Sequence, residues 1–559
     1  MKIDVKENTV VVEETGIKFL KLKTQVAQRI GSLMTSGKNA ISFPVSSLPL
    51  LSDLLEDVVM RNPIVDNVFS RFKLHAKARE IVIKIMESSN QAVTLSGDWC
   101  HILDPAQTRA VAAMTVENLI GLCLFDEQGS GKTVMTIASF DILKQMNKTD
   151  GMVVVCPKTM VNEWHNGIEH FLPNKYKISV VEGTRQQKYE KSFQDFDVLI
   201  TNYETIGTIL VLLSTHASAK RILLVVDESF YLKNEETIRS EYITKFRQKC
   251  QKCFVLCGTP APNSAHDLIN QFDLADLGFT FGGFKKSKKQ ASDWDKIATL
   301  VDTKGVFIRR MKTEILAHVP EKSFHIIHIE LSGKQALMYE QARMDLELKL
   351  RTFNNETFKR SLMTYFQRRA VLLQICSCPT MVDPIFSETP VKYPILDTLL
   401  KRLTAQKRKV IIWSSYKHSL DEIEKRYSEY NPVRIDGTVS SDLRRNAVRR
   451  FQENPETMLF IGNPAAAGAG ITLHAAHDAV FFSYPDQAAH YLQALDRIHR
   501  RGQISDNVNY YLLICKGTIE ETEIIRLREK EIQQHTLLGD HTQWPASIDE
   551  ALKELESYG

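Results

Sequence analysis

Short runs of consecutive apolar residues alternate with stretches of helical periodicity through most of this chain. The runs fall into two sets, which are 120–125, 152–156, 197–201, 222–226 and 253–256, followed by 410–413, 433–435, 458–461, 479–483 and 509–514. Continuous apolar strands separated by helices are typical of a parallel sheet that is covered on both faces. The pattern therefore predicts an α/β chain with two parallel-sheet units of similar architecture.

The N-terminal region, residues 1–97, has a different pattern. Strand signals at 9–12 and 40–44 accompany amphipathic helical signals at 20–33 and 48–59. This mixture predicts a small α+β accessory domain.

The segment between the two sheet units is helical in pattern. Residues 331–382 are rich in Arg and Gln and have no strand signal, and a charged helical stretch at 518–534 follows the second unit. We therefore expect an accessory domain at 1–97, a first lobe at 98–330, a helical insertion or bridge at 331–392, and a second lobe at 393–559.

Composition supports this division. A chain of 559 residues with 43 % hydrophobic content is too long for one core. No apolar run is long enough to span a membrane, and the N-terminus has no secretory signal pattern. The nine scattered cysteines are typical of a reducing compartment rather than of a disulfide framework.

Charge is less decisive than composition. The formal net charge of +4 neither requires nor excludes a nucleic-acid partner. Basic clusters occur at Lys285–Lys289, Arg309–Arg310, Lys407–Lys409 and Arg444–Arg450. A single run of this kind is usually a solvated face, so these clusters gain meaning only beside other motifs.

The clearest candidate site is a glycine loop between an apolar strand and a helix, in DEQGSGKT (126–133). Gly129 and Gly131 allow backbone N–H groups to turn toward phosphate oxygens at a helix N-terminus. Lys132 is expected to contact the β- and γ-phosphates of a nucleoside triphosphate, and Thr133 to ligate Mg²⁺. The strict GxxxxGK[ST] pattern fails because Asp126 holds its first position, and a plain strand–turn–helix corner is the alternative interpretation.

An acidic pair at the end of another apolar strand strengthens the nucleotide hypothesis. Asp227 and Glu228 directly follow the run 222–226. We expect Asp227 to contribute to metal binding and Glu228 to polarise the attacking water, because a buried acidic pair without such a role is costly. Gln107, upstream, stands where an adenine-reading glutamine is expected, although a lone glutamine is more often a surface residue.

The second half contains QALDRIHRRGQ (493–503), in which Arg497 and Arg500 share one helix face. Arginines presented to a transferring phosphoryl group stabilise its transition state, whereas an isolated pair usually makes surface salt bridges. The small residues of NPAAAGAGITLHAA (463–476), Gly470 among them, allow a close approach to a phosphate of nucleotide or nucleic acid.

The ordered motifs resemble those of the Swi/Snf-related ATPases of helicase superfamily two, over about residues 103–530. In order, they are LDPAQ, DEQGSGKT, VVVCPKTMVNEW, ITNYETI, VVDESFYLKN, CGTPAPNS, FIRRMKTEILAHVPEK, VIIWSSY, RIDGTVSSDLRRNAVRRF, NPAAAGAGITLHAA and QALDRIHRRGQ. The resemblance implies two RecA-like lobes that hydrolyse ATP with Mg²⁺ and translocate on double-stranded DNA. Phosphate contacts suit such a motor because they carry no sequence information.

The resemblance also assigns roles to residues. The implied catalytic residues are Lys132, Asp227, Glu228, Arg497 and Arg500, and the implied metal ligands are Thr133 and Asp227. The implied ATP-binding residues are Gln107, Asp126, Glu127, Gln128, Gly129, Ser130, Gly131, Lys132, Thr133 and Gly470. The implied DNA contacts are Lys158, Trp164, Asn202, Tyr203, Lys233, Asn263, Trp413, Thr472 and the Lys285–Lys289 cluster.

Two departures from the family pattern bear on coupling between hydrolysis and DNA. Ser229 and Phe230 turn the usual DEAH-type box into DESF, so its histidine is absent, and Thr472 replaces the usual asparagine. The N-terminal stretch ISFPVSSLPLLSDLL also resembles the small HepA-related domain of annealing helicases, which implies branched DNA as the substrate. A generic α+β domain is the alternative.

Three functional hypotheses follow. The first is a DNA-dependent ATPase that translocates on double-stranded or branched DNA, as a monomeric motor with no membrane role, in a bacterial or viral cytoplasmic setting or in a nucleus. The second is a catalytically weak scaffold for DNA or a protein partner, and the third is a strand-separating DNA or RNA helicase.

A zinc site built on Cys250, Cys253 and Cys257 is disfavoured, because cysteines on a buried strand pack well as core residues.

Overall fold

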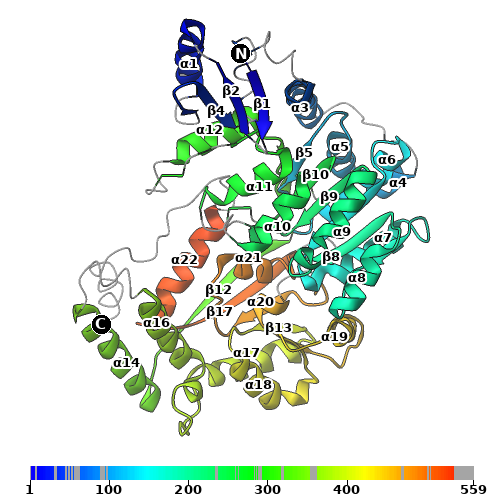
Figure 1. Cartoon of the computed structure of the whole chain (residues 1–559). Helices are drawn as coiled ribbons and strands as arrows, with labels where there is room; N and C mark the ends of the chain where they lie inside the picture. The colour runs from blue at the N-terminus through cyan, green and yellow to red at the C-terminus, as the bar shows by residue number, and fades with distance from the viewer. Residues whose placement is uncertain are drawn as a thin grey trace. The chain divides into compact units, whose positions relative to one another are not determined.

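The computed structural model describes residues 2–6, 9–14, 16–30, 34–44, 47, 51, 54–55, 63–88, 95, 98–232, 237–258, 260–261, 264–282, 284, 286–287, 293–315, 320–352, 362–467, 471–499, 503 and 505–533. The chain divides into two compact units, Met1–Ile315 and Leu316–Gly559 (Figure 1). Among the helices of the described residues, none combines the length and apolar character needed to cross a membrane.

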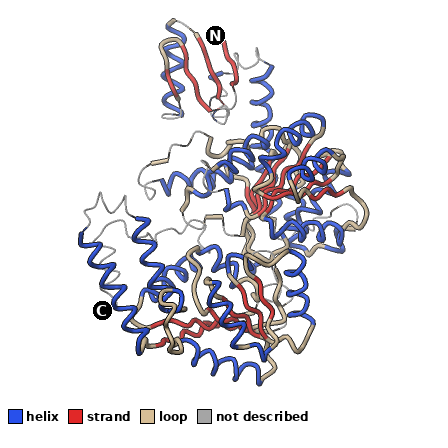
Figure 2. Tube along the Cα trace, turned by 60° about the horizontal axis from the view of Figure 1, so that its bottom comes forward, coloured by secondary structure: helices blue, strands red, loops and turns tan. Residues whose placement is uncertain are grey.

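The first unit begins with a four-stranded antiparallel sheet in the order β1-β2-β4-β3. Its elements are β1 (Lys2–Lys6), β2 (Thr9–Glu13), α1 (Ile17–Ile30), β3 (Thr35–Ser36) and β4 (Ala40–Pro44), and helix α3 (Pro63–Glu87) follows. Helix α1 lies beside this sheet (Figure 2), and its Phe19 and Val26 belong to one buried cluster with Val12 and Phe43 of the sheet. The predicted α+β character is confirmed, whereas most of the predicted helix 48–59 lies outside the described residues.

The first unit continues with a seven-stranded parallel sheet in the order β11-β5-β10-β9-β6-β8-β7. Its strands are β5 (Gly121–Leu124), β6 (Gly151–Cys156), β7 (Ile178–Val180), β8 (Val198–Asn202), β9 (Ile222–Asp227), β10 (Lys252–Leu256) and β11 (Phe307–Ile308). Its helices are α4 (Trp99–Ile102), α5 (Pro105–Met114), α6 (Lys132–Gln145), η3 (Lys158–Met160), α7 (Val161–Phe171), α8 (Arg185–Phe193), α9 (Ile206–Ala219), η4 (Ser229–Leu232), α10 (Ile238–Arg247), α11 (Asp267–Asp276), α12 (Trp294–Lys304) and α13 (Lys312–Ile315). All five strands predicted here are confirmed, with small differences at their ends.

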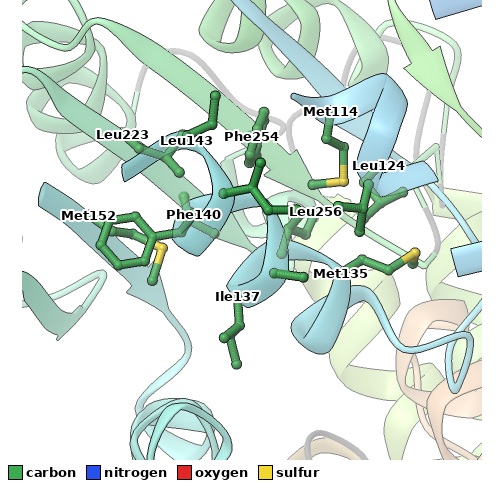
Figure 3. Close-up of a cluster of buried hydrophobic side chains, with 14 of the residues drawn as sticks. Met114, Leu124, Met135, Ile137, Phe140, Leu143, Met152, Leu223, Phe254 and Leu256 are labelled. Carbon is green, nitrogen blue, oxygen red and sulfur yellow. The ribbon is translucent and has the colours of Figure 1, made fainter. Parts of the chain in front are cut away.

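Helix α6 is buried against the middle of this sheet. Figure 3 shows its side chains meeting those of β5, β6, β9, β10 and α5, and the labelled residues are Met114, Leu124, Met135, Ile137, Phe140, Leu143, Met152, Leu223, Phe254 and Leu256. Burial of such side chains contributes on the order of 2 kcal/mol each. This packing fixes the N-terminus of α6, where the glycine loop ends.

The second unit contains a six-stranded parallel sheet in the order β12-β17-β16-β13-β15-β14. Its strands are β12 (Glu321–Ile329), β13 (Val410–Trp413), β14 (Val433–Ile435), β15 (Leu459–Gly462), β16 (Asp478–Phe481) and β17 (Asn507–Cys515). Its helices are α14 (Gly333–Thr352), α16 (Leu362–Ser377), η6 (Pro379–Met381), α17 (Lys392–Ala405), α18 (Lys417–Arg426), η7 (Ser428–Tyr430), α19 (Ser441–Glu453), α20 (Pro464–Ala467), α21 (Ala488–Leu495) and α22 (Ile519–Gln533). Alternate residues of β13, such as Ile411 and Ile412, enter separate cores on the two faces, so both faces are covered as predicted.

The observed division of the chain differs from the predicted end of the first lobe at residue 330. Strand β12 pairs with β17 at every position from Glu321–Asn507 to Ile329–Cys515, so it belongs to the second sheet. The strand lies at the edge of that sheet and most of its side chains are only partly buried or exposed. It therefore lacks the continuous apolar run by which the central strands were recognised.

Candidate nucleotide site

The carboxyl ends of adjacent strands bring the predicted motifs to one edge of the seven-stranded sheet. Leu124, which ends β5, pairs with Leu256 of β10, and Leu256 in turn pairs with Asp227 of β9. The segments that follow these three strands carry the glycine loop, the acidic pair and the Gly258 turn. Ligands of open parallel sheets bind outside this edge, so the fold places the candidate site where such sites occur.

The glycine loop has the backbone conformation that its sequence predicts. Gly129 and Gly131 have φ angles of 85° and 92°, in the left-handed region that favours glycine. A Cβ on Gly131 would lie 2.3 Å from Nε2 of Gln107, so a side chain there would displace the Gln107 amide. Helix α6 begins directly afterwards at Lys132, and its N-terminus supplies the positive dipole end and the backbone donors that bind anions.

Lys132 folds back over the loop that precedes it. Its Nζ donates hydrogen bonds to the carbonyl oxygens of Asp126, at 2.8 Å, and of Glu127, at 3.2 Å. The Oγ of Ser130 is buried, and it has no hydrogen-bond partner among the described residues. An ammonium over a glycine loop, beside a hydroxyl that still needs a partner, fits the phosphates of a nucleotide.

The acidic pair is buried at the end of β9, with Asp227 5 % exposed and Glu228 6 % exposed. The indole Nε1 of Trp164 donates to Oδ2 of Asp227 at 2.8 Å, and the backbone N–H of Glu228 donates to Oδ1 at 2.9 Å. Burial raises the pKa of Asp227, while the Trp164 hydrogen bond and the charge of Lys132 lower it. The carboxylate is thus oriented by fixed donors, as metal-binding carboxylates usually are.

A direct hydrogen bond links the acidic pair to the glycine loop. Nε2 of Gln128 donates to Oε1 of Glu228 at 3.1 Å, and both side chains are buried. A Cβ on Gly258 would lie 2.5 Å from Cγ of Gln128, so the glycine after β10 makes room for this contact. Glu228 itself has a φ of 52°, an uncommon conformation for a residue other than glycine, and such strain is concentrated at functional sites.

Gln107 is a buried part of the site rather than a surface residue. Its side chain completes a capping box with Asp104 at the start of α5. Its Nε2 also donates to the carbonyl oxygen of Ser130 at 2.9 Å, which fixes the glycine loop. This positioning role was not part of the prediction from sequence, which considered only an adenine contact.

Two arginines of the FIRR motif also support the loop, a role that the sequence did not predict. Arg310 makes a two-pronged ion pair with the fully buried carboxylate of Asp126, and its Nη1 donates to the carbonyl oxygen of Ala106 at 2.5 Å. Arg309 Nη1 donates to the carbonyl oxygen of Phe125 at 3.0 Å. Both arginines follow β11, which pairs with β5. This pairing could not be predicted from the sequence, because the strand consists of only two residues, Phe307 and Ile308.

Ser229 of the DESF box connects the acidic pair to a neighbouring helix. Its hydroxyl donates to Oε1 of Gln271 on α11 at 2.6 Å, and Nε2 of Gln271 donates to the carbonyl oxygen of Pro260 at 2.5 Å. Ser229, which precedes the position of the family's missing histidine, is therefore part of a buried chain between the acidic pair and the segment after β10.

The second unit places Arg497 in its interior, 3 % exposed. Its Nη1 donates to the carbonyl oxygen of Ile471 at 2.6 Å and its Nε donates to that of Gln493 at 2.8 Å. The guanidinium thus holds the segment that carries Thr472, which is itself partly exposed. Gly470 and Arg500 lie outside the described residues.

The predicted DNA contacts separate into three groups. Trp164, Asn202, Tyr203 and Trp413 are buried, so their side chains offer no surface to a duplex in this structure. Tyr203, for example, donates its hydroxyl to the carbonyl oxygen of Asp227 at 2.5 Å. Lys158 is exposed directly after β6, and the residues outside the described ranges are Lys233, Asn263, Lys285, Lys288 and Lys289.

The cysteine run 250–257 remains a set of core residues, as predicted. Burial raises the pKa of the Cys253 thiol to about 11. Among the described residues, no cluster of metal-type ligands includes Cys250, Cys253 or Cys257.

Comparisons with known proteins agree with this arrangement. A SNF2-related domain matches residues 67–381, and a helicase conserved C-terminal domain matches residues 391–502. The ISWI chromatin-remodeling complex ATPase ISW1 of Saccharomyces cerevisiae is 26 % identical over 79 % of this chain and 41 % of its own length. An uncharacterized ATP-dependent helicase of Mycoplasma pneumoniae is 27 % identical over 78 % of this chain and 42 % of its own length.

A human relative and a solved structure also match this chain over most of its length. Human SWI/SNF-related matrix-associated actin-dependent regulator of chromatin subfamily A member 1 is 28 % identical over 76 % of this chain and 43 % of its own length. A solved structure, the Sulfolobus solfataricus SWI2/SNF2 ATPase core in complex with dsDNA, covers 80 % of this chain and 95 % of its own, with 22 % identity and a TM-score of 0.36. The chain spans less than half the length of each of the three curated relatives. Because the SNF2-related domain alone accounts for more than half of its residues, the chain belongs to the SNF2-related family.

Proposed function

We propose that the chain is a DNA-dependent ATPase that moves on double-stranded or branched DNA. The observation that carries the proposal is the hydrogen bond between Gln128 and Glu228, which joins the phosphate-binding loop to the acidic pair. This bond supports the proposal, because it joins the glycine loop to the acidic pair at one edge of one sheet.

The residues present fit ATP with Mg²⁺. Lys132 and the backbone of 129–132 would hold the phosphates, and Thr133 with Asp227 would hold the metal. The metal ion would neutralise charge that develops on the transferring phosphoryl group. Glu228, close to Asp227 and fixed by Gln128, would orient the attacking water and accept its proton.

DNA as the partner is supported by the family rather than by a surface of this structure. The related proteins are named as chromatin-remodeling ATPases and, for DDM1 of Arabidopsis thaliana, as an ATP-dependent DNA helicase. The exposed Lys158 and Lys286 and the partly exposed Thr472 are the described residues that we retain as DNA contacts. Branched DNA is the finer part of the proposal, and it rests on the resemblance of the N-terminal domain to HepA-related domains.

The test is the steady-state ATPase rate without nucleic acid and with linear duplex, forked DNA, single-stranded DNA or RNA. We expect stimulation by duplex or forked DNA, and a loss of turnover in Lys132→Ala and Glu228→Gln. Matched controls are the exposed Lys177→Ala and Glu241→Gln, which should retain the wild-type rate.

The two rival functions give different results in the same experiment. A scaffold would show no turnover above that of Lys132→Ala, with or without DNA. A strand-separating helicase would displace a strand from plain DNA or RNA duplexes in a displacement assay. Either result would contradict the proposed translocase.

A further inference from the structure

Three side chains of metal-ligand type meet in the second unit, and none of them has a role in the proposed ATPase. Cys378 directly follows α16, and His418 and Glu422 lie one helical turn apart on α18. The Cys sulfur, a His ring nitrogen and a carboxylate oxygen all lie within 4.8 Å of one another. The three residues come from two segments that are 40 positions apart in sequence, so only the fold brings them together.

The distances are close to those of a tetrahedral zinc site. Sγ of Cys378 is 4.0 Å from Oε2 of Glu422, and Nε2 of His418 is 3.6 Å from Oε1 of Glu422. Zinc bonds of about 2.0–2.3 Å at tetrahedral angles place ligand atoms roughly 3.3–3.8 Å apart. The His418 side chain is 50 % exposed, which leaves its ring room to adjust on metal binding.

Two further hydroxyl groups orient the carboxylate of this cluster. Tyr393 OH donates to Oε2 of Glu422 at 2.9 Å, and Thr380 Oγ1 donates to Oε1 at 3.2 Å. Burial, together with Glu422, raises the pKa of the Tyr393 hydroxyl, so it remains a donor. Residues that hold a ligand in place in this way are a regular part of metal sites.

A second group of similar residues shows why this cluster is the better candidate. Cys376, Cys515 and Glu520 also lie close together, but Nζ of Lys392 is 2.6 Å from Oε1 of Glu520 and both side chains are fully buried. The ammonium already supplies the positive charge that a metal ion would bring. Among the described residues, the groups that contact the Glu422 carboxylate are two hydroxyls, a thiol and a histidine. Arg426, one turn further along α18, forms its ion pair with Asp397 instead.

We propose that Cys378, His418 and Glu422 bind a divalent metal ion of the zinc class, with the fourth coordination position open to water. Burial raises the pKa of the Cys378 thiol, and a bound metal ion would offset this by stabilising the thiolate. Because Cys378 directly follows α16 and the other two ligands lie on α18, the metal would link the end of α16 to α18 within the second unit.

The test uses Co²⁺ as a spectroscopic probe of the full chain, purified without a polyhistidine tag and kept reduced. We expect one equivalent of Co²⁺ to produce a thiolate-to-cobalt absorption band that added Zn²⁺ removes. Cys378→Ser should abolish this band, and His418→Ala, at a half-exposed position, should weaken binding at least tenfold. Tyr393→Phe should weaken binding by about tenfold.

Two matched variants address adventitious binding. Cys100→Ser removes an exposed thiol and Cys250→Ser removes a buried one from the cysteine run, and both should retain the band. Zn²⁺ should also raise the thermal unfolding midpoint of the wild type but not that of Cys378→Ser. Wild-type protein without the band, or a band that persists in Cys378→Ser, would overturn the proposal.

Discussion

At the scale of single residues, the fold gives Asp227 a donor that the sequence motif does not reveal. Trp164, which the sequence suggested as a DNA contact, is fully buried and donates its indole N–H to this carboxylate. Burial alone would favour the neutral acid, whereas a hydrogen bond to the charged form opposes that shift. The tryptophan thus favours the ionised form of Asp227, which we propose as a metal ligand.

We predict that Trp164→Phe shifts the acidic limb of the ATPase pH profile to higher pH. The variant keeps the ring but removes the donor, so the already raised pKa of Asp227 should rise further and metal binding should fail at a higher pH. An acid whose pKa is higher in the folded state destabilises that state as pH rises from its unfolded to its folded pKa. The variant should widen this window and lower the free energy of unfolding by about 2 kcal/mol.

Trp99→Phe is the matched control, because Trp99 Nε1 donates to the buried Asp141 at 2.8 Å in the same unit but outside the site. This variant should also lose stability, yet leave the pH profile unchanged. An unchanged profile in Trp164→Phe would show that the hydrogen bond serves packing alone.

At the scale of elements, β11, the shortest strand of the seven-stranded sheet, positions two arginines that support the glycine loop. Strand β11 pairs with β5, and the two arginines that follow it bind the backbone and the side chain at the start of the glycine loop. The carboxylate of Asp126 is fully buried, and the Arg310 side chain is 12 % exposed. Breaking one partner of a buried pair typically costs about 3–5 kcal/mol, so this link is a substantial part of loop stability.

We predict that Arg310→Lys raises the KM for ATP and lowers the thermal unfolding midpoint. Lysine keeps the charge but cannot make two parallel hydrogen bonds to Asp126 together with one to the carbonyl oxygen of Ala106. Arg239→Lys, whose arginine lies 4.0 Å from a largely exposed glutamate, is the control and should change neither quantity. A normal KM in Arg310→Lys would show that the loop keeps its shape without the two-pronged pair.

At the scale of the whole molecule, the chain contains two parallel-sheet units of the same class, and only the first carries the glycine loop and the acidic pair. Arg497 of the second unit holds the backbone of the segment before Thr472. If ATP hydrolysis at the site of the first unit depends on Arg497, then hydrolysis requires residues of both units.

We predict that Arg497→Ala lowers kcat by about a thousandfold, as the loss of an arginine that stabilises phosphoryl transfer does. Binding of a fluorescent ATP analogue should change little, because the residues that we propose to hold the phosphates belong to the first unit. Arg449→Ala, at an exposed position of α19, is the control and should retain the wild-type kcat. A kcat of Arg497→Ala within a few-fold of wild type would limit this arginine to a structural role.

How much could be predicted from the sequence depended on where each element lies in its sheet. Central strands such as β9 and β13 are buried on both faces, so their sequences are continuous apolar runs that predict them directly. The strands that the pattern missed, β1, β3, β7, β11 and β12, all lie at sheet edges. An edge strand can be short or half exposed, and its pairing depends on residues far away in the chain.

Local patterns were sufficient to predict the two-sheet class and to single out Lys132, Asp227 and Glu228, because glycine turns and a carboxylate pair after an apolar strand have local signatures. The side chains that support these residues became visible only in the folded chain. The contacts of Gln128 with Glu228, of Trp164 with Asp227 and of Arg310 with Asp126 join segments between 63 and 184 positions apart. No local pattern encodes such contacts, since they arise from the order in which the strands are placed side by side.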